Sequence, residues 1–235
     1  MLKTLTRKIR ISLLHFHAAG KHEISLPKNA LIIAPHPDDE VLGCSGVIHR
    51  MVNQGGDVHV VILTGGEKSL AEVTDEELKY TRRRLALHAA NYFGLSNDKI
   101  YFLDYPDGGV SAACAETSKL QAVISKIHPS AIFIPHWGEG WNDHVIVRSI
   151  VQELDCENAA LYEYCVWMWY YNIWRLDWKN AYTLSMNDAE YQAKHNAMKV
   201  YLETLAPCCK PYSGVLPKVL IEAHLWKREL YFKIN

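Results

Sequence analysis

Charge of one sign and long apolar runs are both missing from this sequence. Its 25 lysines and arginines nearly balance 26 aspartates and glutamates, which excludes the broad basic surface of most nucleic-acid-binding proteins. No run of about 18 apolar residues is present to cross a bilayer. We therefore expect a soluble, cytoplasmic protein without a nucleic-acid partner.

Closely spaced cysteines are also missing. Apart from the adjacent Cys208 and Cys209, the six cysteines are scattered, and they form no C-x-x-C motif. This spacing is typical neither of a disulfide framework nor of a structural zinc site. Reduced thiols in the cytoplasm are the simplest interpretation.

Basic residues gather near the start of the chain, in the segment 1–28. The charged residues that precede Glu23 are all basic, namely Lys3, Arg7, Lys8, Arg10 and Lys21. The apolar stretch 11–14 is too short for a signal peptide, and His15 follows it directly. Two interpretations stay open: an ordinary surface segment packed on the domain, or a basic helix that makes weak contact with a membrane surface.

The pattern of apolar residues predicts the fold. A chain of 235 residues, 49% of them hydrophobic, can bury a sizeable core, and we expect a single domain over 1–235. Short apolar runs typical of buried strands alternate with segments typical of helices. The strands are expected at 30–34, 58–63, 100–103 and 131–134, and the helices at 41–52, 75–93, 117–127 and 145–154. This order predicts an α/β, Rossmann-like fold with a mainly parallel sheet and helices on both faces.

The C-terminal part, residues 155–235, is expected to close over the site. Its aromatic stretch at 162–178 begins with the alternation of a strand, and 187–205 has the pattern of a helix. The aromatic rings either pack in the core or stay exposed, where they would stack on sugar faces or meet a lipid-linked substrate. The sequence leaves this choice open, together with the oligomeric state.

The loop after the first predicted strand carries the strongest chemical signal. Residues 34–40 read Ala-Pro-His-Pro-Asp-Asp-Glu, and such crowded carboxylates repel one another unless a cation lies among them. A helix N-cap would account for one carboxylate only. His36 and an aspartate supply the mixed ligands that Zn²⁺ accepts, with Fe²⁺ as the alternative ion. His144 is the best third ligand, because the carboxyl ends of parallel strands share one crevice.

The residues in these loops resemble those of the PIG-L/LmbE-like zinc-dependent N-acetylglucosamine deacetylases. That family has an Ala-His-Pro-Asp-Asp-Glu signature after its first strand, and Pro35 stands here in place of the alanine. Asp143-His144 matches a second motif. Asp107 lies in a matching Phe-Leu-Asp-Tyr-Pro-Asp-Gly-Gly segment, and Arg82 matches an arginine on the long helix. The resemblance spans about residues 30–150.

Carried over residue by residue, the resemblance implies a metal site and a base. His36, Asp39 and His144 would bind one Zn²⁺, with Asp143 supporting the ligands from outside. Asp38 would act as the general base toward metal-activated water. The implied function is removal of the N-acetyl group from a GlcNAc-type sugar or glycoconjugate.

The substrate side of the site includes one departure from the family. The resemblance assigns Arg82 and Asp107 to the substrate, but Trp141 stands where the family usually has a histidine. Tryptophan donates one hydrogen bond and transfers no proton, so His136 or Glu139 in the same loop is a candidate replacement. We therefore expect Trp141 and His136 to contact the substrate as well.

The sequence is also compatible with other functions. The same metal centre could serve a zinc amidase on a non-sugar substrate, or a metal-binding relative that binds carbohydrate with little or no turnover. A nucleotide-binding Rossmann domain is disfavoured, because G-x-G-x-x-G is missing after the first strand and the acidic loop there would repel a pyrophosphate.

Overall fold

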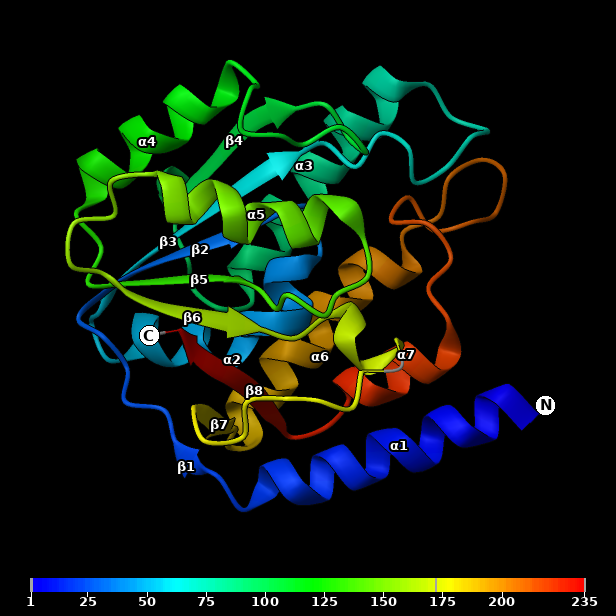
Figure 1. The fold of residues 1–235 in the computed structure, drawn as a ribbon. Helices are drawn as coiled ribbons and strands as arrows, with labels where there is room; N and C mark the ends of the chain where they lie inside the picture. Colours follow the sequence, from blue (N-terminus) through cyan, green and yellow to red (C-terminus); the bar gives the residue numbers. More distant parts are fainter. Residues whose placement is uncertain (1, 172, 235) are drawn as a thin grey trace.

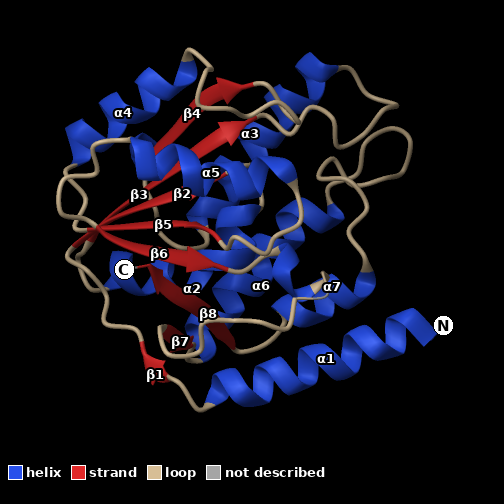
Figure 2. Ribbon diagram, viewed as in Figure 1, coloured by secondary structure: helices blue, strands red, loops and turns tan. Residues whose placement is uncertain are grey.

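An eight-stranded sheet organises the computed structural model, which describes residues 2–171 and 173–234 (Figure 1). The strand order is β1-β7-β8-β6-β5-β2-β3-β4. Helices lie on both faces of the sheet, as Figure 2 shows. The predicted α/β, Rossmann-like class with a mainly parallel sheet is confirmed.

The predicted strands form the parallel part of the sheet. They are β2 (Asn29–Ala34), β3 (Asp57–Thr64), β4 (Ile100–Tyr105) and β5 (Ala131–Pro135), joined by β6 (Ala160–Tyr164). In β2, Ile32 packs in one core, whereas Leu31 and Ile33 pack in the core on the opposite face. Burial on both faces explains the continuous apolar run of this strand.

Four helices follow these strands along the chain. They are α2 (Asp39–Asn53), α3 (Asp75–Asn91), α4 (Glu116–Ile127) and α5 (Asn142–Glu153), with a 3-10 turn, η1 (Asn97–Lys99), before β4. Thr74 caps α3, because its side chain accepts a hydrogen bond from the Glu77 N–H. Helix α5 starts at Asn142 rather than at residue 145, so His144 lies in its first turn.

The C-terminal part contributes to the sheet as well as to the site. It contains a 3-10 turn, η2 (Trp167–Trp169), then β7 (Ala181–Ser185), α6 (Asp188–Glu203), α7 (Lys218–His224) and β8 (Arg228–Ile234). β8 lies between β6 and β7 and is antiparallel to both. The tail was expected to close over the site, and the structure adds a second role, because its last strand completes the sheet.

The N-terminal segment forms helix α1 (Leu2–Ala19) and the short strand β1 (His22–Glu23). One face of α1 packs on the domain through Ile11, Leu14 and Ala18. Arg10 is buried beneath the helix, where its guanidinium donates to the carbonyls of Met168 and Trp169. None of the described helices is long and apolar enough to cross a membrane.

Candidate metal centre

The loop between β2 and α2 is held in one conformation by backbone and side-chain contacts. Thr64 on the neighbouring strand donates to the Pro35 carbonyl from both its N–H and its hydroxyl, at 2.9 and 3.0 Å. The Asp39 carboxylate accepts from the His36 N–H at 2.9 Å. Asp38 has φ 121°, a conformation that is uncommon for residues other than glycine and often marks functional sites.

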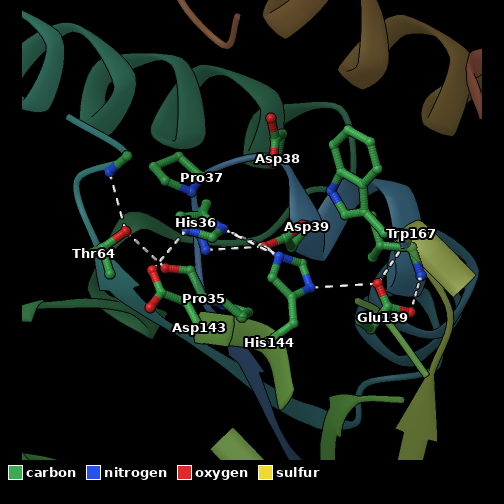
Figure 3. Close-up of polar contacts among 12 residues, drawn as sticks. Pro35, His36, Pro37, Asp38, Asp39, Thr64, Glu139, Asp143, His144 and Trp167 are labelled. Atoms are coloured by element: carbon green, nitrogen blue, oxygen red, sulfur yellow. Dashed lines mark hydrogen bonds and ion pairs between the residues drawn. The ribbon is translucent and has the colours of Figure 1, made fainter. Parts of the chain in front are cut away.

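The three predicted metal ligands converge at the end of these strands (Figure 3). His36 Nδ1 lies 3.2 Å from His144 Nε2 and 3.3 Å from Asp39 Oδ2, and His144 Nε2 lies 3.3 Å from the same carboxylate oxygen. Ligand atoms about 2.0 to 2.1 Å from a tetrahedral zinc ion stand about 3.3 Å apart. The donor types and their separations therefore fit Zn²⁺, and a cation resolves the close approach of the two ring nitrogens.

Two carboxylates lie on the other side of the His36 ring. His36 Nε2 is 3.1 Å from Asp107 Oδ1 and 3.4 Å from Asp143 Oδ2. A proton on Nε2 shared with these oxygens leaves Nδ1 as a lone pair that faces the ligand group. Burial opposes a charge on this ring, but the hydrogen bonds to Asp107, Asp143 and Asp39 raise the pKa of His36 well above its usual value. The surroundings thus favour positive charge.

Asp107 and Asp143 also tie the surrounding loops together. Asp143 accepts hydrogen bonds from the N–H groups of Gly108 and Val110, at 2.7 and 3.2 Å. Asp107 accepts from the Lys68 N–H at 2.7 Å. Asp143 is thus placed to orient His36 from outside the ligand group. Asp107 also contacts His36, in addition to lining the cavity. The sequence indicated no contact between Asp107 and His36.

Glu139 is completely buried behind His144. Its carboxylate accepts hydrogen bonds from the N–H groups of Val166, Trp167 and Met168. One of its oxygens lies 3.4 Å from His144 Nδ1, the ring nitrogen that faces away from the ligand group. Carboxylates in this position orient metal-binding histidines and raise their basicity. Glu139 is thus placed to support a ligand rather than to replace the missing histidine.

Replacing Glu139 by glutamine is expected to weaken zinc binding by about 10 to 100-fold, the usual loss when such an outer support is removed. The amide has only one accepting oxygen, so its NH₂ group would face one of the backbone N–H donors and leave it without an acceptor. Zinc affinity measured by competition with a chelating dye checks this. Glu163→Gln is a matched control, because this second buried carboxylate pairs with Arg148 and not with a ligand. Equal zinc affinity in the two variants would contradict the role of Glu139.

Asp38 and Arg82 form a buried pair on the cavity wall. Arg82 Nη2 donates to Asp38 Oδ2 at 3.2 Å and to the Pro37 carbonyl, and Nη1 donates to the Gly66 carbonyl. Gly66 has φ 65°, and a Cβ there would lie 2.0 Å from Nη1, so a side chain would be strained and would displace the guanidinium. Figure 3 shows the Asp38 side chain pointing away from Asp39. Burial raises the pKa of Asp38 well above its usual value, and Arg82 opposes this shift.

This geometry changes the interpretation of Arg82. The family resemblance assigned its guanidinium to the substrate, whereas three of its hydrogen bonds go to Pro37 and Asp38 in the loop between β2 and α2 and to Gly66 after β3. Arg82 still lines the cavity. Its neighbour Arg83 pairs with Asp104 instead, so the run of arginines serves different partners.

His136 does not line the cavity, and its assignment to the substrate is corrected. The ring is 1% exposed, Nδ1 accepts from the Gly138 N–H at 3.0 Å, and Phe232 packs 4.8 Å away between ring centroids. Burial, helped by Arg148, lowers the pKa of His136 to about 3. A neutral ring enclosed in the core contributes to folding rather than to proton transfer.

The burial of His136 predicts a pH effect on stability. Its pKa of about 3 in the folded protein lies below the unfolded value of about 6.5. The contribution of the neutral ring to the free energy of unfolding is therefore complete above pH 6.5 and is lost as the pH falls below this value. Between pH 7 and pH 5 this linkage removes about 2 kcal/mol. His136→Asn keeps an acceptor for Gly138 without the titration. Urea unfolding should therefore show a smaller loss for the variant than for the wild type, and equal losses would exclude this role.

A cavity of about 370 Å³ opens over the ligand group. Besides the predicted residues it is lined by Lys68, Trp167 and residues 213–216, which no motif indicated. Trp141 is 49% exposed and meets Trp167 edge to face, with ring centroids 5.5 Å apart. Trp141 is therefore accessible to a ligand in the cavity, and its contact with the substrate stays a prediction. Trp169 is buried, so the aromatic stretch serves the core as well as the site.

The fold and the site define a Rossmann-like protein with two histidines and one aspartate placed to hold a metal ion at the carboxyl ends of its strands. The chain belongs to the PIG-L family, described as GlcNAc-PI de-N-acetylase, whose model matches residues 31–154. This confirms the resemblance seen in the sequence motifs. The match covers the predicted ligands, Asp38 and the loops that surround them.

The curated relatives that match part of this chain include a deacetylase and a hydratase. Diacetylchitobiose deacetylase of Thermococcus kodakarensis is 32% identical over 122 residues, covering 50% of this chain and 45% of that protein. 4-Oxalmesaconate hydratase of Pseudomonas putida is 28% identical over 148 residues, covering 59% and 56%. The chain thus spans about half the length of the curated relatives it matches. The structure of N,N'-diacetylchitobiose deacetylase from Pyrococcus horikoshii has the same fold, with a TM-score of 0.62 and 22% identity over 83% of this chain and 73% of that one.

Proposed function

We propose that this protein is a zinc-dependent N-deacetylase that acts on a GlcNAc-type sugar or glycoconjugate. The observation that carries the proposal is the ligand group of His36, Asp39 and His144, whose atoms are spaced 3.2 to 3.3 Å apart at the base of a cavity. Family membership and a relative named diacetylchitobiose deacetylase support the reaction and the substrate class. Zn²⁺ is the ion that these ligands fit best, and Fe²⁺ is the alternative.

The ion supplies Lewis acidity and lowers the pKa of water to about 7 when it is bound. Asp38 accepts the proton of the attacking water on its carboxylate and returns it to the nitrogen as the amide bond breaks. Arg82 fixes the orientation of this carboxylate through its hydrogen bond. One water is consumed: its oxygen joins the acetyl carbon and its proton passes through Asp38 to the nitrogen. Acetate and a free amino sugar are the products.

The same carboxylate serves as base and acid because the cavity lacks the histidine that the family usually has. Among the described residues that line the cavity, the histidines are His36 and His144, both assigned to the metal. The raised pKa of Asp38 suits a group that has to hold a proton between the two steps. Trp141 contributes an aromatic face and an N–H donor to the substrate.

Trp141 is expected to contribute to substrate binding more than to the chemical step. Its exposed ring can pack on the apolar face of a sugar, so Trp141→Ala should raise KM about tenfold, equivalent to about 1.4 kcal/mol, with kcat changed little. Trp141→Phe keeps an aromatic face and should retain most of the affinity. Steady-state kinetics on the best substrate separate the two constants. A fall in kcat at constant KM in the alanine variant would instead assign the indole to the reaction.

Release of acetate from a panel of N-acetylated compounds tests the proposed function. The panel includes N-acetylglucosamine, its β-1,4 disaccharide, GlcNAc linked to an apolar aglycone and an N-acetylated amino acid, each with zinc-loaded, iron-loaded and chelated protein. We expect metal-dependent acetate from the sugars alone. Turnover of the amino acid alone would favour a non-sugar amidase. Because one relative is a hydratase, an unsaturated dicarboxylic acid is added, and hydration of it without acetate release would replace the proposal.

A further inference from the structure

Helix α1 has a second apolar face that the domain does not cover. Leu5, Ile9, Leu13 and Phe16 are 55%, 52%, 55% and 84% exposed. Their spacing of four, four and three residues places them in one stripe along the helix. This outer stripe lies opposite the buried residues Ile11, Leu14 and Ala18. Exposed apolar patches of this kind mark contact surfaces more often than scattered single residues do.

The position of α1 leaves the outer stripe accessible over its whole length. Figure 1 shows the helix running along the edge of the molecule, outside the sheet and its covering helices. Its inner side contacts α7 and β7, and Arg7 and Arg10 on that side bind carbonyls within residues 168–173. The N-terminal end projects beyond α7 in this view.

The charges on α1 are of one sign. The helix contains Lys3, Arg7, Lys8 and Arg10 and no acidic residue. Arg7 and Arg10 turn inward and donate to carbonyls of the aromatic stretch at 162–178, called the aromatic segment below. Lys3 is exposed beside the stripe, and Lys8 is half exposed next to Glu222. An apolar stripe bordered by lysines suits an anionic lipid surface. Pairing two copies of the stripe would bring these lysines together without an acidic partner on the helix.

The aromatic segment connects this helix with the cavity. Arg7 Nε donates to the Tyr170 carbonyl at 3.1 Å, and Arg10 Nη1 donates to the Ile173 carbonyl at 3.3 Å. Trp174 follows directly and is 62% exposed, and exposed tryptophan is favoured at membrane interfaces. Trp167, nearer the start of the same aromatic stretch, lines the cavity.

We propose that the outer stripe of α1 docks the protein on an anionic membrane surface. The apolar side chains enter the interface, Lys3 and Lys8 contact lipid headgroups, and the aromatic segment carries the cavity with the helix to the surface. A substrate with a lipid aglycone would then be reached without leaving the membrane. Docking itself depends on α1 alone and not on the proposed deacetylase function.

Co-sedimentation of the full chain with vesicles tests the docking. Vesicles of phosphatidylcholine alone are compared with vesicles that contain about 30% phosphatidylglycerol, at low and high salt. We expect binding to the anionic vesicles that weakens with salt. Leu13→Ser with Phe16→Ser should reduce it at least about tenfold, because burial of each side chain is worth a factor of about ten or more. Lys3→Glu with Lys8→Glu should abolish the preference for anionic lipid.

Tyr80→Ser is the matched control, because Tyr80 is a large exposed side chain on α3, away from α1 and outside the cavity lining. It should bind as the wild type does, and circular dichroism confirms that all variants are folded. Equal binding of the wild type and the stripe variant, or no binding to anionic vesicles, overturns the proposal. A dimer in sedimentation velocity that the stripe variant dissociates would identify a second copy as the occupant and also overturn it. Neither readout requires metal or substrate, so the outcome is independent of the enzymatic test.

Discussion

His144→Ala is expected to lower metal-dependent turnover by more than about 100-fold, because loss of an outer support alone costs about 10 to 100-fold and this ring is itself a ligand. Its Nε2 is within 3.3 Å of the other two ligand atoms, and the side chain is fully buried. Two ligands would remain, fewer than the three protein ligands typical of a catalytic zinc site. Zinc affinity and kcat/KM should fall together.

His136→Asn provides the matched control for this prediction. It removes another buried histidine from the preceding loop, but one that lies outside the cavity lining. The control should keep the zinc affinity and the turnover of the wild type near neutral pH, where protonation of His136 does not yet lower the stability of the wild type. If His144→Ala retained one tightly bound zinc ion and normal turnover, the ligand assignment would be wrong.

Asp38→Asn is expected to lower kcat by about 10² to 10⁴-fold, the usual contribution of a general acid–base group. Asparagine suits the test because it tolerates a positive φ better than most residues and can still accept the hydrogen bond from Arg82. Asp38 provides no atom of the ligand group, so zinc affinity should stay within a few-fold of the wild type. Single-turnover measurements with saturating zinc give the rate of the chemical step.

Two results would remove Asp38 from the proposed role. Normal turnover of the asparagine variant would show that another group moves the proton. A large loss of zinc would show that the variant damages the metal centre instead of the base. Arg82→Lys supplies a graded comparison, because it keeps a charge near Asp38 but fewer of the hydrogen bonds to the loop. Its kcat should lie between that of the wild type and that of Asp38→Asn.

The sequence predicted the parallel half of the fold for a clear physical reason. Strands β2, β3, β4 and β5 are buried between helices, so each appears as a short apolar run that ends near proline or glycine. Because the loops at their carboxyl ends meet at one edge, the pairing of His36 with His144 followed from topology as well as from the family motif.

Other features depend on contacts between distant segments and left no local signal. β8 pairs antiparallel with β6 and β7, and nothing in its own residues specifies an insertion between them. Glu139 reads as a charged loop residue, yet three backbone N–H groups from the aromatic segment and the ring of His144 surround it. His136 reads as a site residue but packs on Phe232 from the last strand. Only tertiary packing determines these positions.

An anomalous difference map of zinc-soaked crystals, recorded above the zinc edge, tests the metal centre most directly. Two groups of side chains share the His36 ring: Asp39 and His144 on its Nδ1 side, and Asp107 and Asp143 on its Nε2 side. We predict one peak about 2.0 to 2.1 Å from His36 Nδ1, Asp39 and His144 Nε2. A peak between Asp107 and Asp143, or none near His36, would contradict the assignment of the metal ligands and the deacetylase function built on it.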